Sequence, residues 1–197
     1  LCLGGDGIGP EVMKAAVDHV LKPVINHLGY NMKIVDGMIG WDAYDHCGDV
    51  MPDINWGECN EADATMLGSV GLPGRDHEID DPDKRPERGS LLLLRQKLKL
   101  GSNIRPISVM PTLAHLSPLK QRIIGDGVNI TMFRELLGDV YFGNRYEDRF
   151  GKWAADKGTY NREQIESITR VAFDTARKTG ETVTSIDKAN VTTSTST

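Results

Sequence analysis

The sequence is poor in cysteine and contains no long apolar run. Its three cysteines, Cys2, Cys47 and Cys59, form neither a Cys-x-x-Cys pair nor a pattern with histidine that would bind a metal ion. An odd number of cysteines favours free thiols in a reducing compartment. We therefore expect a cytoplasmic protein or, because the sequence begins at Leu1 without a methionine, one of a eukaryotic organelle matrix. No apolar run approaches the roughly 20 residues that span a bilayer, so we expect no membrane partner.

Basic residues are too scattered to suggest a polyanion as a partner. The 28 acidic and 23 basic residues give a net charge of −5, and no dense run of lysine or arginine occurs. This balance gives no electrostatic reason to expect nucleic acid or an anionic membrane as a partner. With 39% hydrophobic and 26% charged residues, the composition is that of a globular protein with one large or two small cores.

The chain opens with a pattern of strand, glycine turn and helix. Residues 1–3 resemble the end of a buried strand and are followed by the turn Gly5-Asp6-Gly7-Ile8-Gly9. Pro10 suits the first turn of the helix that follows, and Gly29 ends that helix. The glycine spacing is G-x-G-x-G and not the G-x-G-x-x-G of dinucleotide-binding loops. A plain structural turn is therefore an alternative to a ligand-binding one.

The remaining patterns alternate between strands and helices, which indicates an α/β fold. A polar loop of unusual length at 71–87 stands out, because such loops are usually functional or mobile. The charged segment 145–160 is expected to form an arm, and the Thr/Ser tract 192–197 a tail that packs against nothing. Strands are expected at 32–35, 62–70, 103–109, 128–133, 140–143 and 182–186, and helices after Pro52 and at 90–99 and 162–178.

Three arginines lie in or beside apolar elements. Arg95 comes late in a leucine-rich helix, Arg105 lies within an expected strand, and Arg134 follows another. Guanidinium groups in such places need anionic partners, and three of them converging would clamp a dicarboxylate by bidentate hydrogen bonds. The alternative for each is a surface or glutamate-paired arginine, with Glu135 as a ready partner for Arg134.

Two further side chains are candidates for proton transfer. Lys188 follows the strand expected at 182–186, where α/β sheets place ligand-facing groups, and a lysine with a lowered pKa can act as a general base. Tyr141 precedes Phe142 and Gly143. Taken singly, a solvated Lys188 paired with Asp187 and a packed Tyr141 ring are the simpler interpretations.

Several motifs occur in one order along the chain. They are Gly5-Asp6-Gly7-Ile8-Gly9-Pro10-Glu11, Leu67-Gly68-Ser69-Val70-Gly71, Arg85-Pro86-Glu87, Leu91 to Arg95, Asn103-Ile104-Arg105-Pro106, Arg134-Glu135-Leu136, Tyr141-Phe142-Gly143, Thr159-Tyr160 and Ser185 to Val191. Any one is weak, but in this order they resemble the isopropylmalate/isocitrate dehydrogenase family of β-decarboxylating dehydrogenases. The resemblance spans nearly the whole chain.

The resemblance implies roles for the candidate residues. Arg95, Arg105 and Arg134 would hold the carboxylates of a small 2-hydroxy dicarboxylate. Lys188 would take the proton from the C2 hydroxyl and would reach the site from the neighbouring subunit of a homodimer. Tyr141 would protonate the enol that remains when carbon dioxide leaves.

The resemblance also implies NAD and Mg²⁺ or Mn²⁺ as cofactors. Ile8, Asn190 and the loop 71–87, with Gly71 and Glu87, would approach the nicotinamide end of NAD. The family's metal-binding aspartates lie beyond the part of the family pattern that this sequence contains, so no metal ligand is expected in this chain.

The residues before Arg95 favour the isopropylmalate branch, whose reaction belongs to leucine biosynthesis. Leu91 and Leu92 offer an apolar surface suited to an isopropyl group, and Val191 is consistent with it. Isocitrate would need polar groups there for its third carboxylate. Gly89-Ser90-Leu91-Leu92 also resembles the tartrate or D-malate branch, which stays an alternative.

The expected fold is the family's mixed-sheet α/β fold in two domains, truncated at the C-terminus. The first domain, 1–100, would be incomplete because the family returns a later segment to its sheet, and 101–191 would form the substrate and dimerisation domain. We expect exposed sheet edges and little turnover from the chain alone. A noncatalytic regulatory subunit of the same family and an unrelated nucleotide- or phosphate-binding α/β protein are the rival interpretations.

Overall fold

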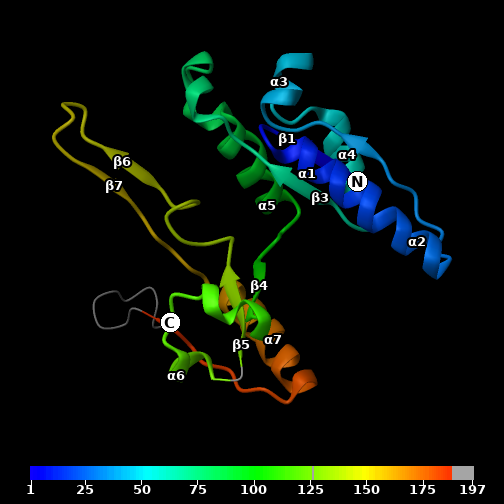
Figure 1. Ribbon diagram of the computed structural model, residues 1–197. Helices are drawn as coiled ribbons and strands as arrows, with labels where there is room; N and C mark the ends of the chain where they lie inside the picture. Colours follow the sequence, from blue (N-terminus) through cyan, green and yellow to red (C-terminus); the bar gives the residue numbers. More distant parts are fainter. Residues whose placement is uncertain (126, 188–197) are drawn as a thin grey trace. The chain divides into compact units, whose positions relative to one another are not determined.

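The computed structural model describes residues 1–125 and 127–187, and the chain divides into two compact units (Figure 1). The first unit comprises Leu1–Leu98 and the second begins at Lys99. Parallel strands with helices make up the first unit, and antiparallel strands with helices make up the second. The mixed α/β architecture agrees with the prediction.

The first unit is built on a parallel three-stranded sheet. Strand β1 (Cys2–Gly5) lies between β2 (Asp36–Gly37) and β3 (Met66–Ser69). The strand expected at 32–35 is wrong, because residues 31–35 have no regular structure. The strand next to β1 begins at Asp36, and of residues 31–35 Val35 accepts the Cys2 N–H, at 2.7 Å. A strand forms only where a neighbour supplies backbone partners, whatever the propensity of the residues.

One long helical segment follows the glycine turn, as predicted. It consists of α1 (Gly9–Ala16), a π-helical turn (Val17–Leu21) and α2 (Lys22–Leu28), and it ends at Gly29 in the left-handed conformation. Pro23, near the start of α2, lacks an N–H group, so it cannot complete the usual hydrogen-bond ladder. A local π turn is a common way for a helix to absorb such an interruption.

The other helices of the first unit are shorter. α3 (Trp41–Cys47) was not anticipated, whereas α4 (Asp53–Glu61) follows Pro52 as expected. The long polar loop contains two 3₁₀ turns, Pro73–Glu78 and Pro82–Lys84, and leads into the leucine-rich helix. That helix consists of a π-helical part, Glu87–Leu92, and α5 (Leu93–Lys97).

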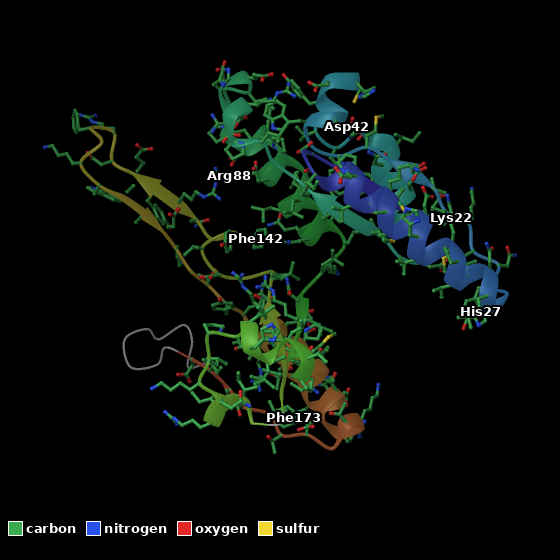
Figure 2. All side chains as sticks on the ribbon, in the orientation of Figure 1. Lys22, His27, Asp42, Arg88, Phe142 and Phe173 are labelled. Carbon is green, nitrogen blue, oxygen red and sulfur yellow. The ribbon has the colours of Figure 1, made fainter. Side chains whose placement is uncertain are left out.

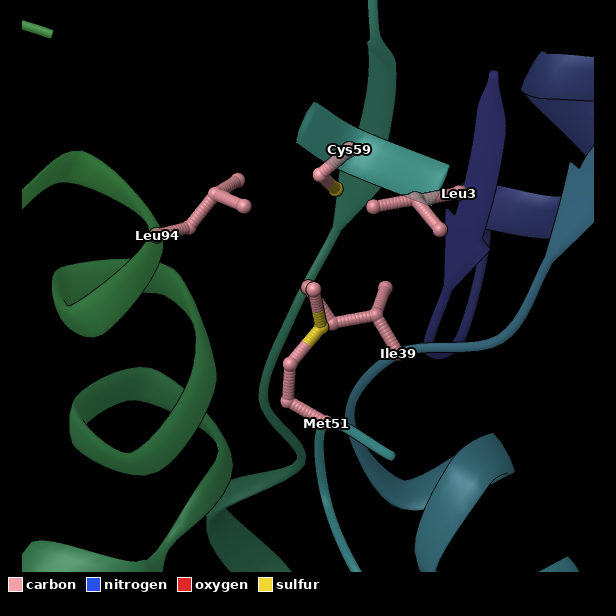
Figure 3. Packing of buried hydrophobic residues seen from close by; sticks show 5 residues of the cluster. All are labelled: Leu3, Ile39, Met51, Cys59 and Leu94. Carbon is pink, nitrogen blue, oxygen red and sulfur yellow. The ribbon is translucent and has the colours of Figure 1, made fainter. Parts of the chain in front are cut away.

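The core of the first unit lies on both faces of the sheet. Successive residues of a strand point to opposite faces, and Cys2 and Leu3 accordingly join different clusters. Leu94 of the leucine-rich helix points toward Leu3 and the side chains around it (Figure 3). Its neighbour Leu93 is 37% exposed. The leucine run therefore covers more than one helix face. The cluster shown comprises Leu3, Ile39, Met51, Cys59 and Leu94.

The second unit contains two antiparallel pairs and one long helix. β4 (Ser102–Val109) pairs with β5 (Val128–Glu135), and β6 (Arg145–Glu147) pairs with β7 (Ala154–Asp156), so the expected arm is a β-hairpin. A 3₁₀ turn, Pro111–Leu116, and α6 (Gln121–Ile124) connect β4 to β5. α7 (Arg162–Thr179) begins at a capping box formed by Asn161 and Gln164 and ends at Gly180.

Two strands predicted for the second unit are wrong. Residues 140–143 form a turn, and residues 181–187 have no regular structure. The described part of this unit is also loosely packed, since α7 has no buried residue and Phe173 on it is 57% exposed (Figure 2). Apolar residues of β4 and β5 such as Ile104 and Ile130 are about half exposed.

Candidate functional site

The glycine turn after β1 is organised by the buried carboxylate of Asp6. One oxygen accepts the backbone N–H groups of Trp41 (2.7 Å) and Asp42 (3.2 Å) at the start of α3, and the other accepts that of Gly71 (2.7 Å). The Ser69 hydroxyl donates to the Asp6 carbonyl at 2.8 Å. Asp6 therefore joins the turn, α3 and the first residue of the long loop, a role that the sequence analysis missed.

Two glycines permit the turn to approach β3 closely. A Cβ atom on Gly9 or on Gly68 would overlap the backbone carbonyl oxygen of Gly4. These glycines thus have a packing reason of their own. The glycines therefore have the structural role that a plain turn requires. Ile8, near the end of the turn, is nevertheless exposed to solvent.

Three residues predicted to bind the cofactor lie at the carboxyl end of the parallel strands. Gly71 has a φ of 109°, and a Cβ there would overlap the Glu87 carboxylate, so Glu87 lies against the Gly71 backbone. Ile8 is 58% exposed, and its neighbour Gly7 faces Leu72. This edge of a parallel sheet is where α/β proteins bind ligands.

The predicted substrate residues of the first unit share the leucine-rich helix. Leu91, Leu92 and Arg95 are each partly buried. Residues three and four positions apart lie on the same side of a helix, so Arg95 lies on the side that Leu91 and Leu92 flank. A basic residue and two apolar residues therefore lie on neighbouring positions of this helix.

The other two arginines lie on one face of the β4–β5 pair. Asn103 is directly opposite Arg134, and Arg105 lies two residues further along β4, which puts all three on the same face. Arg105 Nε donates to Asn103 Oδ1 at 2.9 Å. The Arg134 guanidinium carbon lies 5.9 Å from the centroid of the Tyr141 ring. The two predicted substrate arginines thus share one face of the β4–β5 pair, and the predicted acid, Tyr141, lies beside one of them.

The turn that carries Tyr141 is held by Glu135. The carboxylate oxygens of Glu135 accept the backbone N–H groups of Leu137 (2.8 Å) and Gly138 (2.7 Å), and within the described residues no salt bridge joins this carboxylate to Arg134. The suggested Glu135–Arg134 pair is therefore wrong. Tyr160 packs against Gly138, and burial, followed by the nearby Asp139 carboxylate, raises the pKa of the Tyr160 phenol.

Some predicted site residues cannot be placed. Lys188, Asn190 and Val191 lie outside the described residues. Within residues 1–125 and 127–187, no three His, Cys, Asp or Glu side chains gather closely enough to hold a metal ion. In that same part of the chain, no helix is long and apolar enough to span a bilayer.

Known proteins resemble this chain along almost all of its length. The 3-isopropylmalate dehydrogenase of Thermotoga maritima is 46% identical over 192 residues, and that of Escherichia coli K12 is 43% identical over 192 residues. Each alignment covers 96% of this chain and 52% of the relative, so the chain spans about half the length of these curated relatives.

Solved structures show the same fold. An isocitrate dehydrogenase from Methylococcus capsulatus matches 96% of this chain and 51% of its own length, with a TM-score of 0.73 and 24% identity. A β-decarboxylating dehydrogenase from Thermococcus kodakarensis matches 99% of this chain and 50% of its own, with a TM-score of 0.64 and 28% identity. The family model of isocitrate/isopropylmalate dehydrogenases matches residues 1–197. Since that match covers every residue, the chain belongs to the isocitrate/isopropylmalate dehydrogenase family.

Proposed function

We propose that this chain is part of a 3-isopropylmalate dehydrogenase, which oxidises and decarboxylates 3-isopropylmalate with NAD to give 2-oxoisocaproate. The observation that carries the proposal is the placement of Arg105 and Arg134 on one face of β4–β5, with Tyr141 beside Arg134. Two guanidinium groups suit a dicarboxylate, and a phenol suits the protonation of an enol. The names of the curated relatives point to the same substrate.

The residues of this chain divide the work. Arg105 and Arg134 bind the substrate carboxylates and orient C2 and C3, and Lys188 from the second subunit of a homodimer takes the hydroxyl proton. After carbon dioxide leaves, Tyr141 donates a proton to C3, the carbon that carried the departing carboxylate. NAD, when bound, accepts the hydride from C2.

The open edge of the first unit suits the dinucleotide. The Gly71 backbone, the Glu87 carboxylate and the exposed Ile8 side chain would contact its nicotinamide end, and Asn190 would join them. The described residues contain no group of side chains that fits Mg²⁺ or Mn²⁺.

Substrate choice would depend on the leucine-rich helix. Leu91 and Leu92 are partly buried beside Arg95 and provide apolar surface for the isopropyl group. Ser90, which suggested the tartrate or D-malate branch, is fully buried, and its hydroxyl donates to the Pro86 carbonyl at 2.5 Å. Its hydroxyl is used inside the helix, which favours the apolar substrate.

NADH formation by the full-length product of the gene that encodes this chain tests the proposal. With NAD and Mn²⁺, we expect kcat/KM for 3-isopropylmalate to exceed that for D-malate, tartrate or isocitrate at least about 10-fold, the usual worth of an apolar contact in a pocket. Tyr141→Phe and Lys188→Ala should abolish turnover.

Each other outcome has a definite meaning. A preference for D-malate or tartrate would keep the mechanism and refute the specificity assigned to Leu91 and Leu92. A folded dimer without activity toward any of the four substrates would refute the proposal that the protein is an enzyme. It would favour the noncatalytic regulatory subunit instead.

A further inference from the structure

Arg75 lies in the 3₁₀ turn Pro73–Glu78 of the long loop and makes two bidentate pairs. Its Nη1 and Nη2 atoms donate to the two carboxylate oxygens of Asp45, each at 2.8 Å. Its Nε and Nη2 atoms donate to those of Glu78, at 2.7 and 2.8 Å. The guanidinium carbon also lies 4.3 Å from the centroid of the buried Trp41 ring. All three nitrogens and one face of the guanidinium are thus engaged.

These contacts connect the loop to α3. Asp45 and Trp41 belong to α3, whereas Arg75 and Glu78 belong to the loop. Two apolar loop residues, Leu72 and Ile79, pack in the same cluster as Trp41. The backbone N–H of Trp41 and that of Gly71 bind opposite oxygens of the Asp6 carboxylate. The first residue of the loop and its first turn are therefore both tied to α3.

The charges of this cluster depend on Arg75. Hydrogen bonds from Arg75 lower the pKa of the Asp45 and Glu78 carboxyls, and those two carboxylates raise the pKa of the guanidinium. Without the guanidinium, two like charges would lie near each other, and the loop would lose its contact with Trp41. Isolated surface pairs contribute little, but bidentate arginine pairs in a network are the exception.

We propose that Arg75 is a positioning residue that clamps the loop segment 71–79 onto α3 and thereby holds Gly71, with Glu87 against it, for the dinucleotide. The proposal rests on the proposed function, because the dinucleotide is the ligand that this edge is inferred to bind. Arg75 itself touches no reacting atom. Its effect should appear in the binding of the cofactor and not in that of the hydroxy acid.

The test compares variants of the full-length gene product. Arg75→Gln removes both the positive charge and the guanidinium group that makes the two bidentate pairs. Arg75→Lys keeps the charge but cannot make the bidentate pairs. Arg162→Gln is the matched control, because Arg162 pairs with Glu166 at 2.7 Å on the exposed face of α7. Hydrogen exchange of the amides of 71–79 reports on the loop. Fluorescence titration with NADH and the two KM values report on the site.

We expect faster exchange in 71–79 for Arg75→Gln and a rise of roughly five- to tenfold in the NADH dissociation constant and in KM for NAD, the low end of typical coupling between sites. KM for the hydroxy acid should change less than about twofold, within the range of an untouched site. Arg75→Lys should fall between Arg75→Gln and the wild type, and Arg162→Gln should match the wild type.

Several results would overturn the proposal. Unchanged exchange in Arg75→Gln would show that the clamp does not hold the loop, and faster exchange with unchanged NADH affinity would show that it does not position the site. Equal rises in both KM values, or an equal effect of Arg162→Gln, would indicate general destabilisation. If the wild type binds no NADH, the proposed function fails, and the exchange rates alone decide whether Arg75 clamps the loop.

Discussion

Replacing Asp6 by alanine should destabilise the protein more than the loss of any exposed carboxylate. Asp6 is 4% exposed, and its carboxylate accepts two short hydrogen bonds, from the N–H groups of Trp41 and Gly71, both at 2.7 Å. A buried donor left without a partner costs about 1–3 kcal/mol. The Trp41 N–H is such a donor, and the part-buried Gly71 N–H adds a smaller loss. The longer bond to Asp42 adds little. This loss is a large part of the roughly 5–15 kcal/mol that stabilises a typical domain.

Urea denaturation of the full-length gene product, followed by circular dichroism, would measure this loss as a lower midpoint at an unchanged slope. Asp6→Asn should lose about half as much, because an amide has one acceptor oxygen and can serve either α3 or Gly71 but not both. Asp49→Ala is the matched control, since the exposed Asp49 accepts one backbone bond, from Met51 at 2.9 Å. A loss for Asp6→Ala no larger than that of Asp49→Ala would refute the role given to the carboxylate.

Three further predictions concern close packing and charge. Gly143→Ala should lower the free energy of unfolding by about 1–3 kcal/mol, as overpacking does, because the added Cβ would overlap the Lys157 carbonyl oxygen. Gly57→Ala, in α4 with open space around its Cα, should instead raise it by about 0.5–1 kcal/mol, and equal effects in thermal denaturation would contradict both predictions. Hydrogen bonds from Lys14 and then Lys22 lower the pKa of Asp18 from 3.8 to about 2. Its stabilising contribution should therefore be present above pH 3.8 and lost as the pH falls through about 2, and an NMR titration of Lys14→Gln should show the pKa returning toward 3.8.

Helix ends were predictable because their signals are local. Pro10 begins the first helix and Gly29 ends it, and Gly180 ends α7, each through the backbone preference of the residue itself. The strands expected at 140–143 and 182–186 failed because a strand needs a partner. α3 was missed for a related reason, since its first N–H groups are bound by Asp6, a residue 35 positions earlier in the chain.

The sequence supplied the candidate site residues, but their arrangement depended on the tertiary structure. The order of the motifs was enough to select the family, and the leucines before Arg95 were enough to suggest an apolar substrate. Only the antiparallel register of β4 and β5 places Arg105 on the face of Arg134, and only the folded turn gives the Glu135 carboxylate to two backbone N–H groups. The bonds from Arg75 to Asp45 likewise join residues 30 positions apart. Local propensity and motif order depend on residues that are close in the sequence. Pairings between distant residues form only when folding brings the two residues together and restricts their other conformations.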